Sequence, residues 1–424
     1  MHRRVVITGL GVCAPNGVGL EAFIKAVVDG QSGIRFIPQL LKLGFGCQIA
    51  GEPQLSEKML SKYFTTLQQR GLRATGIIYG TIAGMDAWKD AGLPETSDDT
   101  VDWDTGILFG TGTLGVDKFH EAMNLIDEGK VRRLGSTTVI QTMASGISAY
   151  LGGILGCGNQ VTTNSSACTT GTESILMAYE RIASGKADRM LAGSCGDSGP
   201  YVWGGFDAMR ILPRNYNENP EAASRPMSAS ASGFVPGSGA GALLLESLES
   251  AKARGARIYA EIAGGSVNSG GQRGEGSMTA PNSEGVQRCI RQAIENSGVE
   301  AEDIDSINGH LTATTKDALE IKNWSEALGR SGEDFPMINS FKGQIGHCLS
   351  AAGSIECVAA VLQFDRECIF GNTNCEDIHP DIQEIVDAKC IPQKTLSRSP
   401  NILAKASFGF GDVNACVIFR RFSD

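Results

Sequence analysis

The sequence predicts an α/β protein made of two similar halves. Apolar runs rich in strand-forming residues alternate with stretches of helical periodicity, which is typical of βαβ units around buried strands. These runs lie at residues 3–8, 105–110, 160–164, 189–194, 257–264, 304–309, 337–341, 402–411 and 415–422. The chain of 424 residues also exceeds what a single hydrophobic core usually supports. We therefore expect a buried, mostly parallel sheet and a division near Gly255 into halves 1–255 and 256–424.

The composition fits a compact globular protein of a reducing compartment. Hydrophobic residues make up 42% of the chain, charged residues 20%, and glycine occurs 54 times, which suits tight turns and close backbone approaches. The net charge of −10 disfavours nucleic-acid binding. The first apolar run meets glycines and Pro15 too early for a signal sequence or a membrane span. Twelve cysteines without C-x-x-C spacing predict reduced thiols, no metal site and a cytoplasmic location.

Three glycine patterns resemble phosphate-binding loops, and each has a simpler interpretation. The most complete, GTGTLG at 110–115, follows an apolar run and precedes residues 116–123, which can form a helix. No matching acidic ribose ligand follows at the required distance, so we interpret this pattern as a tight strand-to-helix turn. A second pattern, at 9–14, is interrupted by Pro15, and the glycines at 237–241 precede a strand.

The segment around Cys168 has the pattern of a nucleophile at a helix N-terminus. A β-like run ends in small residues at 164–167, and an amphipathic stretch begins at or beside Cys168. The helix dipole and free N–H groups there favour a thiolate, so we expect a lowered pKa for this thiol. A buried structural cysteine in a strand-to-helix turn explains the same pattern. The segment alone leaves both interpretations open.

Two of the five histidines, His310 and His347, each follow an apolar strand-like run and have glycine, serine or threonine neighbours. Such loop positions often carry functional side chains on a rigid scaffold. A lone histidine there is more often a structural hydrogen-bond donor. Lys342 precedes His347, and Glu356 follows it on a stretch with helical periodicity. A Lys342–Glu356 pair would anchor the loop, or it would be an ordinary, partly exposed ion pair.

Segments spread over almost the whole chain resemble one protein family. They are RRVVITGLGVCAPNG at the start, SSACTTGTESI around Cys168, the Arg225-Pro pair, GFVPGSGAGALLLE, the two histidine segments and SFGFGDVNACVIF near the end. Together these motifs resemble the elongating β-ketoacyl-acyl carrier protein synthases, including the catalytic ketosynthase subunits of type II polyketide systems. The resemblance implies a thiolase-like fold, in which two duplicated βαβαβ halves form a five-layered α-β-α-β-α core.

The resemblance also implies a role for each matching residue. Cys168 would be acylated, and His310 and His347 would polarise a malonyl thioester as it loses carbon dioxide. This step leaves an enolate, which neutral imidazole N–H donors would stabilise. Lys342 would orient the two histidines, supported by Glu356. The remaining implied positions are the oxyanion-hole N–H groups of Cys168 and Phe410, the pantetheine contacts Thr312 and Thr314, and the acyl-pocket gate of Phe408, Phe410 and Thr113.

The implied reaction is a decarboxylative Claisen condensation, in which an acyl-enzyme thioester is extended by two carbons from malonyl-acyl carrier protein. This acyltransferase chemistry belongs to polyketide, polyene or fatty acid biosynthesis. It needs no cofactor or metal in the enzyme, because the phosphopantetheine is carried by the acyl carrier protein. The resemblance implies a dimer, either of two identical chains or with a homologous chain-length subunit. The starter group, the chain length and the pathway do not follow from it.

The chain departs from the family pattern at several positions. Leu311 follows the first of the two histidines where the family has glycine, and the loop lacks a proline, which affects the pantetheine contacts. Residues 231–234 replace a charged turn, and Ser238 stands where an acidic residue is common. Asp412 replaces the last glycine of the closing motif, which predicts a gating loop that is stiffer or holds a partner charge. Because Thr113 is small and polar, we expect a roomier or more polar acyl pocket, suited to a polyketide or polyene chain.

Other functions fit fewer of these residues. A thiolase needs a second cysteine in a Cys-x-Gly-Gly-Gly loop, which Cys416 does not provide. Priming and chalcone-type synthases use a Cys-His-Asn set, whereas the Lys342–His347 segment favours Cys-His-His. A cysteine hydrolase would need a water-activating triad beyond these same residues. The main alternative is a non-catalytic chain-length partner in a ketosynthase heterodimer, and Cys168 argues against it because such subunits typically lack the nucleophile.

Overall fold

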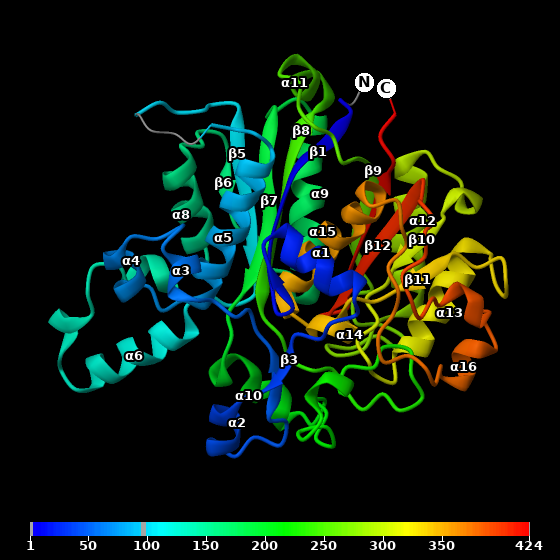
Figure 1. The fold of residues 1–424 in the computed structure, drawn as a ribbon, viewed down its shortest axis with the longest axis horizontal. Helices are drawn as coiled ribbons and strands as arrows, with labels where there is room; N and C mark the ends of the chain where they lie inside the picture. The colour runs from blue at the N-terminus through cyan, green and yellow to red at the C-terminus, as the bar shows by residue number, and fades with distance from the viewer. Residues whose placement is uncertain (1–2, 95–98, 424) are drawn as a thin grey trace.

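The computed structural model describes residues 3–94 and 99–423 (Figure 1). The strands of the first half are β1 (Val5–Ala14), β2 (Gly17–Val18), β3 (Ile34–Phe36), β4 (Ile49–Gly51), β5 (Thr105–Thr111), β6 (Val161–Thr162), β7 (Arg189–Gly196) and β8 (Gly239–Ser247). Those of the second half are β9 (Ala260–Ser269), β10 (Ser306–Asn308), β11 (Met337–Asn339), β12 (Ile402–Gly409) and β13 (Val413–Arg420). All but β3 and β4, which form a separate pair, belong to one sheet.

The α-helices connect these strands and cover the sheet. In the first half they are α1 (Leu20–Val28), α2 (Pro38–Lys42), α3 (Glu57–Leu60), α4 (Thr66–Gly71), α5 (Thr75–Asp90), α6 (Val116–Asp127), α7 (Thr138–Thr142), α8 (Gly146–Leu155), α9 (Thr170–Ala183), α10 (Pro200–Ala208) and α11 (Leu248–Ala253). In the second half they are α12 (Ser283–Ser297), α13 (Asp317–Leu328), α14 (Lys342–Ile345), α15 (Ala352–Asp365) and α16 (Pro380–Gln383).

Each half contributes strands to the main sheet in the same spatial order and with the same directions. The order is β6-β5-β7-β8-β1 in the first half and β11-β10-β12-β13-β9 in the second. Residues 5–7 of β1 pair with residues 260–262 of β9 and join the two halves into one sheet. The repeated order confirms the predicted duplication, while a domain boundary near Gly255 stays a prediction.

The expectation of a mostly parallel sheet is wrong. Within the described residues, only β5–β6, β5–β7, β10–β11 and β10–β12 are parallel pairs of the main sheet. β8 runs antiparallel to both β1 and β7. A short turn after Gly409 joins β12 to β13, and such a turn can join only antiparallel neighbours. Apolar runs therefore indicated which strands are buried, but not their directions.

The helices form three layers around the two halves of the sheet (Figure 1). α9 and α15 pack together in the middle layer, α5 and α8 cover the first half, and α12 and α13 cover the second. Every residue from Ala352 to Phe364 of α15 is buried, as expected of a helix with neighbours on all sides. α12 buries one face, which includes Val286, Ile290 and Ala293. This arrangement confirms the five-layered α-β-α-β-α core.

The glycine patterns serve packing and turns. A Cβ atom on Gly9 would lie 2.2 Å from Ala87 O, and one on Gly11 would lie 1.9 Å from Ala83 O. Both glycines therefore allow α5 to lie directly against β1. The GTGTLG segment at 110–115 contains the last two residues of β5 and the connection to α6, which confirms the predicted strand-to-helix turn.

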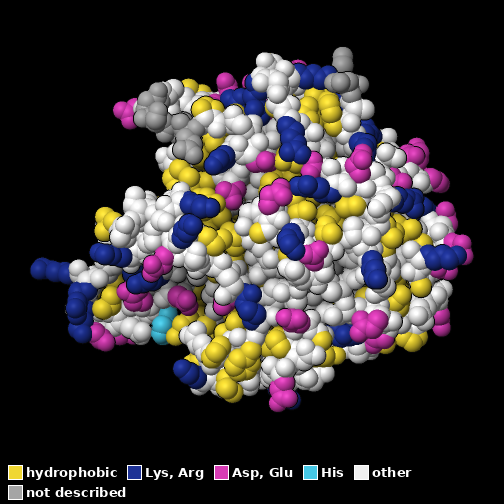
Figure 2. Space-filling view, in the orientation of Figure 1, with side chains coloured by type: hydrophobic (Ala, Val, Ile, Leu, Met, Phe, Trp, Pro, Cys, Tyr) yellow, Lys and Arg dark blue, Asp and Glu magenta, His cyan; other side chains and the backbone are white. Residues whose placement is uncertain are grey.

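The helices, the surface charges and the cysteines can be compared with the environment that the sequence predicts. None of the helices in residues 3–94 and 99–423 has both the length and the hydrophobicity that a membrane crossing requires. On the face shown in Figure 2, basic and acidic side chains are interspersed. All twelve cysteines are free thiols, and most of them are buried.

Candidate active site

Cys168 lies in a short 3₁₀ turn, Ala167–Thr169, immediately before α9. The hydroxyl of Thr170 fixes this turn, because Oγ1 donates to Ala167 O at 2.7 Å and accepts from Ser166 N at 2.9 Å. Ala167 has a φ of 50°, in the left-handed region that non-glycine residues rarely adopt. Strained backbone persists where the surrounding structure over-determines it, and it is common at functional sites. The turn thus presents the thiol at a fixed position.

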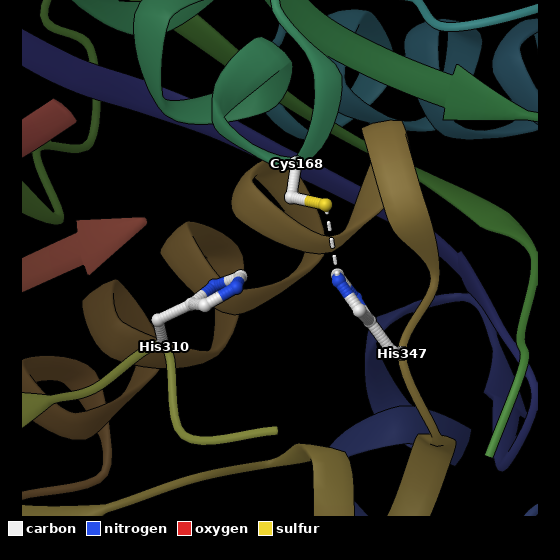
Figure 3. Close-up of side chains that lie close together, drawn as sticks. All are labelled: Cys168, His310 and His347. Carbon is white, nitrogen blue, oxygen red and sulfur yellow. Dashed lines mark hydrogen bonds between the residues drawn. The ribbon is translucent and has the colours of Figure 1, made fainter. Parts of the chain in front are cut away.

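The structure brings Cys168, His310 and His347 together, with both rings directed toward the sulfur (Figure 3). His347 Nε2 lies 3.2 Å from Cys168 Sγ. The centroids of the two imidazole rings are 5.3 Å apart, and the ring planes are nearly perpendicular, at 83°. One ligand-type atom from each residue lies within 4.8 Å of the others. Among the described residues, this is the one group of histidine, cysteine and carboxylate side chains close enough to hold a metal ion.

His347 presents an N–H group to the sulfur. The backbone N–H of Leu349 donates to His347 Nδ1 at 3.3 Å, so the neutral ring carries its proton on Nε2. The backbone N–H of His347 donates to Val235 O at 2.7 Å, which fixes the main chain. Burial and the charges of Lys342 and Lys405 hold the pKa of His347 well below its usual range. The ring is therefore a neutral hydrogen-bond donor near neutral pH.

His310 is neutral for the same physical reasons. Burial first, and then the charges of Lys342, His347 and Lys405, hold the pKa of His310 well below its usual range. Its Nδ1 has no hydrogen-bond partner among the described residues. The ring packs edge-on against Phe408, with 6.2 Å between centroids. An imidazole held in this way retains hydrogen-bonding capacity for a substrate.

Two carboxylates that the sequence analysis did not single out hold the loop after His310. The backbone N–H groups of His310 and Leu311 donate to Glu320 of α13 at 2.6 and 2.7 Å. The next three backbone N–H groups, at 312–314, donate to Asp317 of the same helix. Burial raises the pKa of both acids, that of Glu320 to about 7. The sequence does contain a signal for these two residues: Asp317 and Glu320 are acids three positions apart at the start of a helix that closely follows His310.

The expected lowering of the Cys168 pKa is wrong. Burial raises this pKa to about 11 and outweighs the opposing effects of the Lys342 charge and of the backbone N–H groups of Phe410 and Cys168. The regular helix also begins only at Thr170, beyond the thiol. In its resting state the site therefore contains a neutral thiol beside two neutral imidazoles.

Lys342 and Glu356 form the expected ion pair, and it is fully buried. Lys342 Nζ on α14 donates to Glu356 Oε1 on α15, and the two side chains are 1% and 0% exposed. The alternative of a partly exposed pair is therefore wrong. Lys405 on β12, which the sequence analysis did not consider, lies 2.9 Å from the second oxygen, Glu356 Oε2.

A cavity of about 690 Å³ adjoins the thiol and the histidines. Its lining includes Thr113, Cys168, His310, Thr312, Thr314, His347, Phe408 and Phe410. Residues 279–281, in a loop that the sequence analysis did not mention, also line it. The hydroxyl oxygens of Thr312 and Thr314 lie 3.1 Å apart, and the Phe410 ring lies 6.2 Å from that of Phe206. The expected gate and pantetheine residues thus share one cavity with the thiol.

Asp412 connects the loop after Phe410 to a second loop. Its carboxylate accepts hydrogen bonds from the backbone N–H groups of Gln272 and Asn282, at 2.9 Å each. The backbone N–H of Gly411 donates to Met278 O at 2.8 Å. Of the two expectations for Asp412, the contacts favour a stiffer loop, because the carboxylate binds backbone N–H groups.

Comparison with known proteins identifies the family. The model of the β-ketoacyl synthase N-terminal domain matches residues 2–251, and that of the β-ketoacyl synthase C-terminal domain matches residues 259–376. This chain belongs to the β-ketoacyl synthase family. It is 33% identical to a 3-oxoacyl-[acyl-carrier-protein] synthase 2 of Rhizobium meliloti (strain 1021), over 99% of both chains. It is 31% identical to a putative polyketide beta-ketoacyl synthase 1 of Streptomyces halstedii, over 99% of this β-ketoacyl synthase and 98% of that one.

Solved ketosynthase structures have the same fold. One is a type II polyketide acyl-carrier protein in complex with its ketosynthase bound to the hexaketide, where the matching chain has a TM-score of 0.86, 29% identity and 100% coverage of both chains. Another is the ishigamide ketosynthase/chain length factor, with a TM-score of 0.87, 28% identity and the same coverage. These matches confirm the expected thiolase-like fold.

Proposed function

We propose that this β-ketoacyl synthase condenses an acyl group held on Cys168 with malonyl-acyl carrier protein, releasing carbon dioxide. The observation that carries the proposal is the 3.2 Å contact between His347 Nε2 and Cys168 Sγ, with His310 beside it at the cavity. A thiol next to two neutral imidazoles offers both a nucleophile and donors for an enolate. The 3-oxoacyl synthase relatives support the same reaction.

In the first stage the acyl group moves from its carrier to the enzyme. Cys168 Sγ attacks the acyl thioester carbon, the bond from that carbon to the pantetheine sulfur breaks, and the thiol proton leaves with the pantetheine thiol. The N–H of His347 stabilises the thiolate form of Cys168 during attack. The backbone N–H groups of Cys168 and Phe410 are both close enough to the Cys168 sulfur to lower its pKa. They hold the oxyanion of the tetrahedral intermediate.

In the second stage the malonyl group enters the same cavity. The bond between its α-carbon and its carboxylate breaks, carbon dioxide leaves, and the electron pair becomes an enolate. Neutral N–H donors of His310 and His347 stabilise the enolate oxygen. The α-carbon then attacks the acyl-Cys168 carbonyl, the C–S bond breaks, and a carrier-bound β-ketoacyl product two carbons longer leaves. These reaction steps use no metal or cofactor in the enzyme.

The other expected residues act around this chemistry. Lys342, paired to Glu356, tunes the two histidines by its charge and does not line the cavity. Thr312 and Thr314 line the cavity with adjacent hydroxyls that can bind the amides of the pantetheine arm. Phe408, Phe410 and Thr113 border the acyl chain. These are the remaining members of the proposed site.

We propose an acyl carrier protein and a second ketosynthase-like chain, identical or homologous, as partners. Two solved relatives are described as a ketosynthase in complex with its acyl-carrier protein and as a ketosynthase/chain length factor. β6 ends the strand order of the main sheet, and its Val161 is 37% exposed, so this edge can extend the sheet across a dimer. The free cysteines support a reducing, cytoplasmic location.

A polyketide or polyene chain is the proposed acyl group, with a saturated fatty acyl chain as the alternative. The small, polar Thr113 lines the cavity, which supports a roomier or more polar pocket. Single-turnover condensation with saturated long-chain and with polyketide-type acyl carriers compares the two. Equal rates for both classes would argue against the polyketide preference.

Intact-mass analysis of the wild type and of Cys168→Ala, incubated with acyl-carrier and malonyl-carrier proteins, tests the reaction. We expect an acyl adduct on the wild type alone and a carrier product extended by two carbons. If Cys168 is never acylated, even in the presence of a co-purified partner chain, the protein is instead the non-catalytic chain-length subunit.

A further inference from the structure

Lys405 is a fully buried lysine in the interior of β12, and its side chain is 0% exposed. Lysine is almost never fully buried unless it is paired. The Nζ atom lies 2.9 Å from Glu356 Oε2, donates to the backbone carbonyl of Ala406 and lies 3.2 Å from Ser407 Oγ. The ammonium therefore has polar partners, but it shares its carboxylate with another cation.

The second cation is Lys342, which contacts the other oxygen of Glu356. Two ammonium groups thus share a single carboxylate at a fully buried position. Within residues 3–94 and 99–423, no other carboxylate lies within 4.0 Å of either ammonium. The buried cluster of Lys342, Glu356 and Lys405 consequently has an excess of one positive charge. This charge is only weakly screened, because the surrounding protein interior has a low polarity.

The excess charge acts electrostatically on the catalytic histidines. The charges of Lys342 and Lys405 act on titratable groups from every element around them. These groups are Glu356 and Cys357 from α15, Glu320 from α13, Cys416 from β13, Cys168 before α9, and His310, His347 and Cys348 from their loops. Both lysine charges lower the pKa of His310 and of His347, in addition to the effect of burial. A nearby positive charge disfavours a second one, so protonation of either imidazole costs more.

Lys405 also connects to the helix that follows the nucleophile. Ser407 Oγ lies 3.2 Å from Lys405 Nζ and 2.9 Å from Thr172 Oγ1 on α9. All of these side chains are buried. A chain of polar contacts therefore runs from Glu356 to the start of α9: an ion pair joins Glu356 to Lys405, and hydrogen bonds join Lys405 to Ser407 and Ser407 to Thr172.

We propose that Lys405 is a positioning residue of the condensation: its ammonium supplies the excess charge that keeps His310 and His347 neutral and able to donate hydrogen bonds. The inference deepens the proposed function and rests on it. Lys342 alone, neutralised by Glu356, would leave the cluster without net charge. With Lys405 present, the site stays ready to stabilise an enolate at lower pH, and it favours the anions that form during decarboxylation.

The test compares the wild type with Lys405→Met, which has a side chain of similar length without the charge. Lys389→Met is the matched control, because Lys389 lies in the same half, is 72% exposed and pairs with Glu333 at the surface. NMR of histidine-labelled protein, with His310 and His347 assigned from single substitutions, follows both titrations directly. We expect a roughly tenfold or greater rise in the proton affinity of at least one of the two in Lys405→Met and no change in Lys389→Met.

Carbon dioxide release from malonyl-carrier protein as a function of pH provides the functional measurement. In Lys405→Met we expect the rate at about pH 5.5, relative to that at about pH 7.5, to fall at least threefold further than in the wild type. A uniform loss of rate with an unchanged pH profile and unchanged histidine titrations would overturn the proposal and assign Lys405 a structural role. Lys405→Gln, which retains hydrogen bonding to Ser407, replaces the methionine variant if that variant does not fold. A wild type that releases no carbon dioxide contradicts the proposed function itself, and the histidine titrations still decide the electrostatic claim.

Discussion

Replacing Asp412 should loosen the loop at 270–282 without unfolding the enzyme. Asp412 is 1% exposed, and its two carboxylate oxygens accept hydrogen bonds from Gln272 N and Asn282 N. Its φ of 60° lies in the left-handed region, which asparagine adopts about as readily as aspartate. Asp412→Asn therefore removes the charge and one acceptor at little backbone cost, whereas Asp412→Ala removes both acceptors and adds backbone strain.

The magnitude follows from these two bonds. A hydrogen bond to a charged group contributes about 1.5–3 kcal/mol, and the freed N–H groups regain water when the loop opens. We expect the free energy of local opening to fall by about 1.5 kcal/mol in Asp412→Asn and by about 3 kcal/mol in Asp412→Ala. Since about 1.4 kcal/mol corresponds to a factor of ten, amide exchange should accelerate roughly tenfold and roughly a hundredfold, respectively.

Hydrogen–deuterium exchange of peptides covering 270–282 measures this opening. Asp127→Asn, which removes an exposed carboxylate at the end of α6, is the control and should leave the exchange unchanged. Because residues 279–281 line the cavity, the Asp412 variants should also raise the KM for long acyl carriers more than that for short ones. Wild-type exchange in Asp412→Ala would refute the inference that this carboxylate holds the two loops together.

The buried ionisable groups should also affect stability and thiol reactivity. Glu356→Gln leaves two buried ammonium groups without a carboxylate, so the free energy of unfolding should fall by about 3–5 kcal/mol in urea denaturation. An unchanged urea midpoint would contradict the buried charge cluster. Because the pKa of Cys168 is raised to about 11, iodoacetamide inactivation should accelerate continuously as pH rises from 7 to about 10, and a plateau below about pH 8 would show a lower pKa. The folded-state pKa of Glu320, about 7, exceeds that of an unfolded glutamate, so its ionisation destabilises the fold as pH rises. The stability of Glu320→Gln relative to the wild type should therefore improve by about 2–3 kcal/mol between about pH 5 and pH 8, and thermal unfolding that shows no such trend would argue against a raised pKa.

Much of the fold and the convergence of the site could be predicted from the sequence. Strand positions came from apolar runs, and the repeat of strands and helices after Gly255 indicated the duplication. Cys168, His310 and His347 each follow a predicted strand within a few residues, and parallel strands of neighbouring units bring such ends to one side of the sheet. The buried Lys342–Glu356 pair needed the structure to distinguish it from a surface ion pair.

The predictions that were wrong, and the residues that were not predicted, have physical causes. Strand direction depends on connections, and the antiparallel course of β8 and the β12–β13 turn leave no trace in apolar periodicity. The pKa of Cys168 depends on burial by distant segments, whereas the sequence shows only the local helix start. In the sequence, Lys405 cannot be distinguished from an ordinary strand residue, because its partner, Glu356, lies on another element. Glu320 resembles a usual first-turn acid of a helix, and only the fold turns it toward the loop of His310.

The roles of Cys168 and of the two histidines are separated by measuring the two half-reactions independently. Acyl adduct formation and carbon dioxide release are measured side by side in the wild type, in Cys168→Ala and in His310→Ala and His347→Ala. We expect Cys168→Ala to form no adduct yet still release carbon dioxide from malonyl-carrier protein. Each histidine variant should still form the adduct, more slowly in His347→Ala because its N–H contacts the thiol, but should decarboxylate at least about a hundredfold more slowly. Decarboxylation at the wild-type rate in both histidine variants would contradict the assignment of the two imidazoles as the donors that stabilise the enolate.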